Sequence, residues 1–367
     1  MRYFLRILFS LFFCVLLVAG YMGYEAYSFL HTAPVKEGQS VYFDVAAGAR
    51  LGAVAEKLQA QGIITNARYF TFLARFKNEQ NKMKAGRFAL RTDWFPEQVL
   101  ATLVHGKPVL YRITVPEGLT YWQTGLLLEE AGFVKAADFN HVVCDPAFLR
   151  HHGIPFPSAE GFLMPDTYLL KKPETNLERG LDDTTRSEGT VKTQESSSLL
   201  QAKAIAGRLV DTFWQKTQEL WPNSHRPPKD MLQRSVILAS IVEKETALEE
   251  ERPRVAGVYA NRLEKKMLLQ ADPTVIYGLG PSFSGRLLYR HLNDTSNKYN
   301  TYQHPGLPPG PICSFGISAL KAALHPEQHD FLYFVAKTDG GEHVFSRRLE
   351  EHNRAVQEYR KTTKKNK

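Results

Sequence analysis

The longest apolar run of the chain lies at its amino terminus. It extends from Ile7 to about Tyr24 and follows arginines at positions 2 and 6. A helix rises about 1.5 Å per residue, so a run of this length nearly crosses a hydrocarbon layer of roughly 30 Å. We predict that residues 1–30 are a cytoplasmic amino terminus and a transmembrane anchor. Because Arg2 and Arg6 favour the cytoplasmic side, the rest of the chain should lie outside it.

A cleaved signal peptide is the alternative for this segment. The small residues of Val18-Ala19-Gly20 offer a cleavage site. The apolar run is long for a signal peptide, however, and tyrosines at positions 21, 24 and 27 suit a membrane interface. These features favour the anchor, and both alternatives export the body of the protein.

Shorter periodic segments follow between residues 37 and 107. Residues 40–45 alternate between apolar and polar side chains, which predicts a strand. Apolar positions then recur at helical spacing over residues 51–62 and 67–76, and residues 85–90 return to a strand pattern. The order strand, helix, helix, strand predicts one small α+β module.

The rest of the chain divides into a connecting unit, an insertion and a larger domain. A strand at residues 109–115 and a helix at 123–131 belong to the connecting unit, residues 108–170. Residues 171–198 are rich in Thr, Ser, Glu, Asp and Lys. Such a segment cannot bury enough apolar surface to offset its ordering entropy, so we predict a flexible insertion. Residues 199–360 form the largest domain, and residues 361–367 form a basic tail.

The largest domain mixes helices with a hairpin. Helical spacing predicts helices over residues 199–214, 229–251 and 255–263. Two strand-like segments, residues 331–336 and 343–345, flank the turn Asp339-Gly340-Gly341 and predict a hairpin. The expected fold class is therefore α+β, with a single transmembrane helix, a small α+β module and a larger α+β domain.

One glutamate lies where an apolar residue is expected. At about 100° per residue, the helix of residues 229–251 carries an apolar stripe formed by Ile237, Leu238, Ile241, Val242 and Leu248. Glu245 lies near the middle of this stripe, whereas Glu243 points to nearly the opposite side. Burial raises the pKa of a carboxyl group, and a carboxyl protonated near neutral pH can act as a general acid. The alternative is a buried glutamate paired with Arg234 or Arg262.

Other clusters carry chemistry that suits a sugar ligand. Asp272 directly precedes Pro273, which is also the signature of a helix start with Asp at the N-cap. Tyr299, Asn300 and Tyr302 place two aromatic rings around an amide, although such residues are also common in ordinary loops. The stiff Gly/Pro segment of residues 306–311 is suited to wall a groove.

Metal and cofactor chemistry find little support. His325 and His329 have i, i+4 spacing, but Pro326 lies between them and no third ligand is evident. The sequence contains no phosphate loop and no dinucleotide fingerprint. We therefore expect no metal and no cofactor.

The net charge of +8 suits an anionic membrane surface, an acidic polymer or a nucleic acid. The absence of zinc-finger spacing and of an aromatic RNA-binding signature argues against nucleic acid. Cys14 lies in the first apolar run, and neither Cys144 nor Cys313 has a C-x-x-C partner. These last two are either a disulfide of an exported protein or two separate buried thiols.

These motifs, in this order, resemble the YceG-like endolytic murein transglycosylases, also called the MltG family. The resemblance rests on Glu160-Gly161 with Pro165-Asp166-Thr167, on Ala239-Ser240-Ile241-Val242-Glu243-Lys244-Glu245-Thr246, on Leu269-Gln270 with Asp272-Pro273-Thr274-Val275, on Tyr299-Asn300-Thr301-Tyr302, on Gly306-Leu307-Pro308-Pro309-Gly310 and on His325-Pro326. It covers the exported chain except residues 171–198, which depart from the family pattern.

The resemblance implies a lytic transglycosylase of the bacterial inner membrane, single-pass, with a periplasmic catalytic domain at residues 199–360 and a LysM-like module at residues 37–107. It implies cleavage of the MurNAc–GlcNAc β-1,4 bond in nascent glycan strands, with 1,6-anhydroMurNAc ends, which helps to terminate glycan elongation. It makes Glu245 the catalytic residue. The substrate-binding residues that it implies are Gln270, Asp272, Thr274, Tyr299, Asn300 and Tyr302. The expected partners are peptidoglycan strands, the inner membrane and peptidoglycan synthases.

Two other functions remain open. A lysozyme-like muramidase would hydrolyse the same polymer with Asp272 as a second carboxylate, because hydrolysis normally needs two. A lytic transglycosylase can use one, here Glu245. The second alternative is a noncatalytic peptidoglycan-binding scaffold that recruits synthases.

Overall fold

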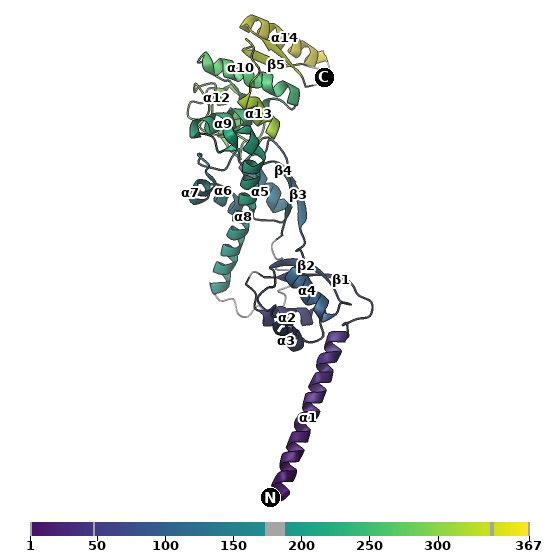
Figure 1. The fold of residues 1–367 in the computed structure, drawn as a ribbon. Helices are drawn as coiled ribbons and strands as arrows, with labels where there is room; N and C mark the ends of the chain where they lie inside the picture. The colour runs from purple at the N-terminus through teal and green to yellow at the C-terminus, as the bar shows by residue number, and fades with distance from the viewer. Residues whose placement is uncertain (1, 47, 173–187, 338–340, 366–367) are drawn as a thin grey trace. The chain divides into compact units, whose positions relative to one another are not determined.

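The computed structural model describes residues 2–46, 48–172, 188–337 and 341–365 (Figure 1). The chain forms two compact units. Unit 1 comprises Met1–Tyr111 with Lys171–Asp182, and unit 2 comprises Arg112–Leu170 with Asp183–Lys367. Helices and two-stranded sheets occur together, so the predicted mixture of helix and sheet is confirmed.

Unit 1 begins with one long helix, α1 (Arg2–His31). Its segment Phe12–His31 is long and apolar enough to cross a membrane, and nearly all residues of this segment are exposed. A signal sequence at an amino terminus passes the same test, so the helix agrees with both alternatives of the sequence analysis.

The remainder of unit 1 is a small α+β module. Its two strands, β1 (Ser40–Val45) and β2 (Gly86–Arg91), pair antiparallel with Ser40 opposite Arg91. Three helices surround them, namely α2 (Leu51–Ala60), α3 (Ala67–Phe76) and α4 (Pro96–His105). The order β1, α2, α3, β2 confirms the predicted strand, helix, helix, strand, whereas the sequence analysis had not identified α4.

The core of this module includes the end of α1. Phe29 is buried together with Phe43, Leu58, Phe70 and Phe88. The Phe29 ring lies 5.8 Å from that of Tyr69 on α3, measured between centroids. The last turn of α1 is therefore part of the folded module, because burying an aromatic ring fixes the element that carries it.

Unit 2 begins with a short sheet and a group of helices. Its strands β3 (Tyr111–Val115) and β4 (Asp166–Leu170) pair with each other. Three helices lie between them in the sequence, namely α5 (Tyr121–Glu130), α6 (Ala136–Val143) and α7 (Pro146–His152). Cys144, which follows α6, and Cys313 are both free thiols.

The helix α8 (Glu188–Thr217) begins earlier than expected. Residues 188–198 had been assigned to the flexible insertion, yet the structure makes them helical; residues 173–187 lie outside the described part of the chain. Buried side chains such as Ala202, Ile205 and Leu209 anchor the second half of α8 in unit 2. Once a helix is anchored, each further residue adds a hydrogen bond at little cost, so a polar sequence can extend it.

The centre of unit 2 is the helix α9 (Lys229–Glu245). All residues from Ser235 to Val242 are buried, because α9 packs against α10 (Arg252–Glu264), α11 (Asp272–Leu279) and α13 (Ile317–Leu324). Burial therefore surrounds α9 and is not confined to one stripe. The short helices that complete this region are η2 (Gln218–Leu220), η3 (Pro222–Ser224), η4 (Glu249–Glu251) and α12 (Tyr289–Leu292).

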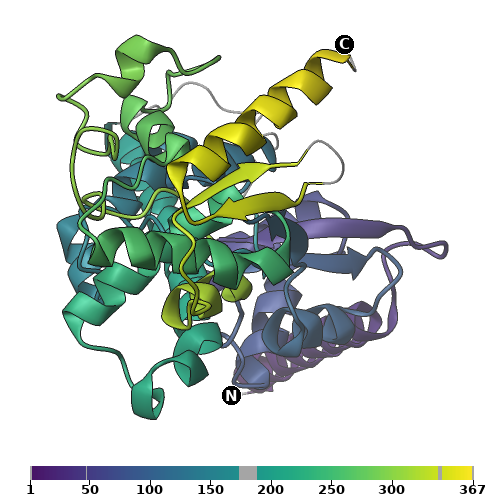
Figure 2. The same ribbon diagram turned by 90° about the horizontal axis from the view of Figure 1, so that it is seen from above.

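The carboxyl-terminal part of unit 2 is a hairpin with a helix. The strands β5 (Tyr333–Ala336) and β6 (His343–Ser346) pair antiparallel, which confirms the predicted hairpin. Figure 2 shows α14 (Leu349–Lys365, yellow) beside these strands. Part of the predicted basic tail is thus helical, because α14 extends to Lys365.

Candidate active site

Glu245 is the last residue of α9. The predicted helix over residues 229–251 was too long, because Thr246 adopts an extended conformation (φ −143°, ψ 135°) and ends it. The Thr246 side chain accepts a hydrogen bond from the Leu248 N–H, which stabilises this end of the helix. Glu245 is half-buried as a residue, and its carboxyl group is desolvated.

The surroundings of Glu245 favour its protonated form. The pKa of Glu245 is raised from 4.5 to about 7, chiefly by burial and also by the negative charge of Asp272, whereas Tyr259 and Arg262 act in the opposite direction. The negative end of the α9 dipole also disfavours a carboxylate at this position. A carboxyl group with a pKa near 7 can donate a proton and later accept one at neutral pH.

The hydroxyl group of Tyr259, on α10, donates a hydrogen bond of 2.8 Å to Oε1 of Glu245. Tyr259 itself is buried, so this contact fixes the orientation of the carboxyl group. The alternative of a simple ion pair with Arg262 does not describe the site. The guanidinium of Arg262 donates instead to the carbonyl oxygens of Leu269 and Leu332, each at 2.7 Å.

Accessible polar groups lie close to Glu245. Asp272 is the first residue of α11 rather than its N-cap, and its carboxylate accepts a 2.6 Å hydrogen bond from the Tyr302 hydroxyl. The charge of Asp272 raises the pKa of Glu245, and that of Tyr302 raises the pKa of Tyr259. Gln270 is exposed and has a left-handed backbone (φ 50°), and its N–H donates to the Thr301 carbonyl. Asp272 and Tyr302 therefore lie beside Glu245, and the backbone of Gln270 is bonded to the residue before Tyr302.

Two other predicted binding residues shape the backbone instead. Asn300 is fully buried, and its amide donates to the carbonyl oxygens of His291, Leu292 and Asp294. Thr274 is also fully buried and shares a 2.9 Å hydrogen bond with Thr301. Neither side chain has surface to offer a ligand. We infer that both residues stabilise the loop that carries Tyr302.

Tyr299 belongs to a separate aromatic row. Its ring lies 4.9 Å from that of Tyr277, which lies 4.9 Å from that of Trp122. The charge that raises the pKa of Tyr299, after burial, is that of Glu160 rather than that of Glu245. The six predicted binding residues therefore do not gather at one point.

Glu160 is a second perturbed carboxyl group, which the sequence analysis used only for the resemblance. Burial raises its pKa to about 8. Its Oε2 accepts a 3.0 Å hydrogen bond from the Tyr121 N–H. Gly161, which follows it, has φ 78°, and a Cβ there would lie 2.8 Å from Val236 on α9. The sequence signal was a glutamate next to an apolar run, Phe162-Leu163-Met164.

Glu243 differs from its predicted environment. The prediction placed it opposite the buried stripe, but its side chain is only 6% exposed. Its carboxyl oxygens bind Arg252, at 3.0 Å, and the Gly316 N–H, also at 3.0 Å. Burial raises the pKa of Glu243, while Gly316 and Arg252 lower it. Glu243 thus joins α9, α10 and the start of α13.

Comparison with known proteins places the chain in a family. The sequence model described as the YceG-like family matches residues 43–358. The chain is 28% identical over 335 residues to a Bacillus subtilis protein named endolytic murein transglycosylase, covering 87% of this chain and 85% of that protein. A Streptococcus pneumoniae protein of the same name is 27% identical over 382 residues, and the match covers 96% of this chain but only 64% of that longer protein.

A solved structure supports the same relationship. The crystal structure of a YceG-like protein from Listeria monocytogenes shares 29% sequence identity with this chain. It superposes with a TM-score of 0.51, over 87% of this chain and 99% of that one. With a family match that spans most of both units and the buried carboxyl groups of its motifs in place, this chain belongs to the YceG-like family.

Proposed function

We propose that this protein is a lytic transglycosylase that cuts peptidoglycan glycan strands, with Glu245 as its single acid and base. The observation that carries the proposal is the desolvated carboxyl group of Glu245, whose pKa is raised to about 7 and whose orientation is fixed by Tyr259. The names of the relatives from B. subtilis and S. pneumoniae support this reaction class. In this proposal Glu245 is the proton donor and Asp272 lies beside it.

One carboxyl group suffices for the proposed reaction. The protonated Glu245 gives its proton to the glycosidic oxygen as the bond from C1 of MurNAc to that oxygen breaks. The resulting carboxylate then takes the proton of the MurNAc C6 hydroxyl while O6 attacks C1. The products are a GlcNAc hydroxyl and a 1,6-anhydroMurNAc end, and Glu245 is again protonated. No water molecule is consumed.

The muramidase alternative is favoured by one observation, the carboxylate of Asp272. It is exposed and lies close enough to Glu245 to raise its pKa. In a hydrolase, a second carboxylate activates water or forms a covalent intermediate. Mass spectrometry of fragments from uncrosslinked glycan separates the two reactions. Anhydro ends support the proposal, and reducing ends formed with incorporation of labelled water would reject it.

The pH dependence of the enzyme should follow the protonation of Glu245. The first step needs the protonated form, so kcat/KM should fall as pH rises through about 7. The Tyr259 hydrogen bond lowers the pKa of Glu245, because it stabilises the carboxylate. In Tyr259→Phe, we therefore expect the alkaline limb to move to higher pH, by roughly 1–2 units if the bond has the usual strength of a hydrogen bond to a charged group.

Tyr302→Phe provides a matched control for this shift, because it removes a hydroxyl bonded to Asp272 and not to Glu245. We expect it to move the alkaline limb much less than Tyr259→Phe does. An unchanged limb in Tyr259→Phe, with the fold intact, would show that another group governs the profile.

We also infer that α1 anchors the protein in the inner membrane, with unit 2 on the periplasmic side. Arg2 and Arg6 precede the apolar span, which favours this orientation. Protease added to spheroplasts should then digest unit 2 while a cytoplasmic marker survives. Full protection of unit 2 in intact spheroplasts, and digestion only after lysis, would reverse the topology.

The small module of unit 1 supports a LysM-like assignment. Its β1, α2, α3 and β2, with antiparallel pairing of the two strands, form a compact unit in the region where the resemblance implies that module. We propose that this module contacts the glycan or its surroundings while unit 2 carries the chemistry. Recruitment of peptidoglycan synthases and termination of glycan elongation belong to the same proposal.

A further inference from the structure

The helix α3 of unit 1 has an unusual exposed face. Phe72 and Phe76 are 65% and 77% exposed, although both are large apolar residues. Their rings stack on each other with centroids 6.4 Å apart. Arg68 and Arg75 lie on the same side of α3, because residues 68, 72, 75 and 76 follow the i, i+4, i+7, i+8 spacing of one helical face. We call these four residues the α3 face.

The α3 face has no partner within the described part of the chain. The opposite side of the helix, with Phe70, Leu73 and Ala74, is buried in the module core. Arg68 and Arg75 are exposed, and no ion pair joins either guanidinium to an acidic residue among the residues described. Two stacked phenylalanines flanked by two free arginines are the composition of a surface that binds an anionic, partly apolar partner.

The position of α3 identifies that partner as a membrane. Tyr69, three residues before Phe72 and seven before Phe76 on α3, contacts the buried Phe29 of α1. Phe29 lies in the last turn of α1, two residues before the end of the apolar segment Phe12–His31. The polar layer on each side of a bilayer is roughly 5–8 Å thick, so α3 is held at its edge.

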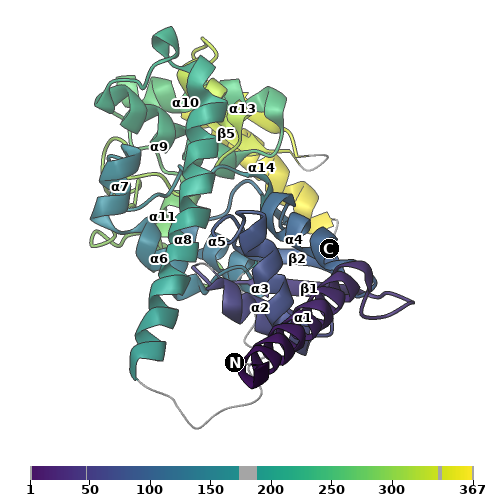
Figure 3. The same ribbon diagram turned by 60° about the horizontal axis from the view of Figure 1, so that its bottom comes forward.

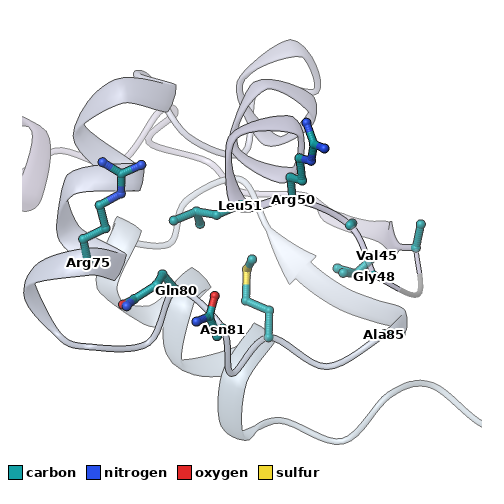
Figure 4. A pocket seen from close by; sticks show the side chains of 11 residues that line it. Val45, Gly48, Arg50, Leu51, Arg75, Gln80, Asn81 and Ala85 are labelled. Atoms are coloured by element: carbon teal, nitrogen blue, oxygen red, sulfur yellow. The ribbon is translucent and has the colours of Figure 1, made fainter.

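Two views of unit 1 agree with this argument. In Figures 1 and 3, α3 lies beside α1 at the end of the module from which α1 extends. A pocket of about 510 Å³ next to α3 adds further positive charge, since it is lined by Arg50 as well as Arg75 (Figure 4). Basic residues at this level are attracted to anionic lipid head groups, and aromatic rings favour the same interfacial depth.

We propose that the α3 face docks on the anionic surface of the membrane that α1 enters, with the rings of Phe72 and Phe76 inserted among the head groups. The proposal rests on the membrane anchoring inferred above for α1. It gives unit 1 a second attachment, which limits the tilt of the module relative to the bilayer. Amphipathic surfaces of this kind bind membranes through apolar insertion combined with attraction to anionic lipids.

The test uses the full chain, reconstituted into vesicles of phosphatidylcholine and phosphatidylglycerol. Three single variants carry a new tryptophan, Phe72→Trp and Phe76→Trp on the α3 face and Leu126→Trp as control. Leu126 is a matched control, because it is also an exposed apolar helix residue but belongs to α5 of unit 2. The emission that each variant adds to the native protein is measured with ordinary lipids and with lipids brominated in the acyl chains.

We expect brominated lipids to quench the emission added at positions 72 and 76 and to leave that of position 126 unchanged. High salt should weaken the same quenching, and it should do so less in the Arg68→Gln/Arg75→Gln background, because the charges that salt screens have been removed there. Equal quenching at all three positions, or none at 72 and 76, would overturn the proposal. A blue shift at 72 and 76 without quenching would also overturn it, because a protein then covers the face.

Failure of the anchor can be recognised separately. If α1 does not span the bilayer, the protein will not float with the vesicles after alkaline washing, whatever the fluorescence. If the protein floats and the α3 face is not quenched, the anchoring stands and the docking of α3 is wrong.

Discussion

Glu245→Gln should abolish most of the activity of this protein and leave its fold intact. General acid/base catalysis by one side chain typically contributes about 10²–10⁴-fold in rate, and Glu245 serves both proton transfers of the proposed reaction. We therefore expect the rate at which 1,6-anhydroMurNAc ends are released to fall by a factor at the upper end of that range or larger. Purified protein acting on uncrosslinked glycan, with products counted by mass spectrometry, measures this loss.

The stability of the same variant separates catalysis from folding. The pKa of Glu245 is raised from 4.5 to about 7 in the folded protein. A group of this kind favours the folded state below pH 4.5, and that contribution disappears as pH rises through 7. Glutamine stays neutral and can still accept the Tyr259 hydrogen bond. At pH 8 the melting temperature of Glu245→Gln should therefore equal or exceed that of the native protein, whereas a large decrease would assign Glu245 a structural role.

Glu243→Gln should have the opposite effect and destabilise the protein. Glu243 and Arg252 are 6% and 4% exposed and form a 3.0 Å ion pair. Removing one member of a buried pair typically costs about 3–5 kcal/mol, because the other charge remains buried. Glu117 lies 3.4 Å from Arg252 and can still compensate in part, so we expect the lower end of this range. Denaturant unfolding at pH 7 of the protein without its apolar anchor measures this change in the free energy of unfolding.

A double variant provides the control for Glu243. In Glu243→Gln/Arg252→Met the buried cation is also removed, so the loss of stability should be smaller than the sum of the two single losses. Activity that Glu243→Gln loses through unfolding should then be regained in the double variant together with the fold. If Glu243→Gln is as stable as the native protein but inactive, the general acid has been assigned to the wrong residue of the Glu-Lys-Glu motif.

Local patterns were sufficient for most elements of unit 1 and for the hairpin. The alternation of residues 40–45 and the helical spacing of residues 67–76 reappear as β1 and α3 with nearly the same bounds. Asn66 accepts hydrogen bonds from the first turn of α3, so the start of this helix is encoded by a residue next to it. The sequence Asp339-Gly340-Gly341 after β5 is another local signal, which explains why the hairpin was predicted correctly.

Element ends and the surroundings of α9 could not be predicted in this way. Glu245 was identified by its position on an apolar stripe, but its place at the end of α9 depends on the extended conformation of Thr246. Glu243 was expected to face away from the core. In the structure α10 and α13 cover that side of α9 as well, and no property of the α9 sequence reports which helices will pack around it.

The sequence by itself determined the apolar amino-terminal helix, the mixed fold class, the glutamate pair of α9 and the family to which the motifs belong, because each of these is written in residues close together in the chain. The tertiary structure alone decided the roles of individual side chains. Asn300 and Thr274 carry the right chemistry for a sugar ligand, yet both are buried. The pKa of Glu160 is raised because the fold buries its carboxyl group, although its hydrogen-bond partners act in the opposite direction. Burial, ion pairing and desolvation arise between segments far apart in sequence, and they separate a carboxyl group that supports the fold from one that can exchange a proton with a substrate.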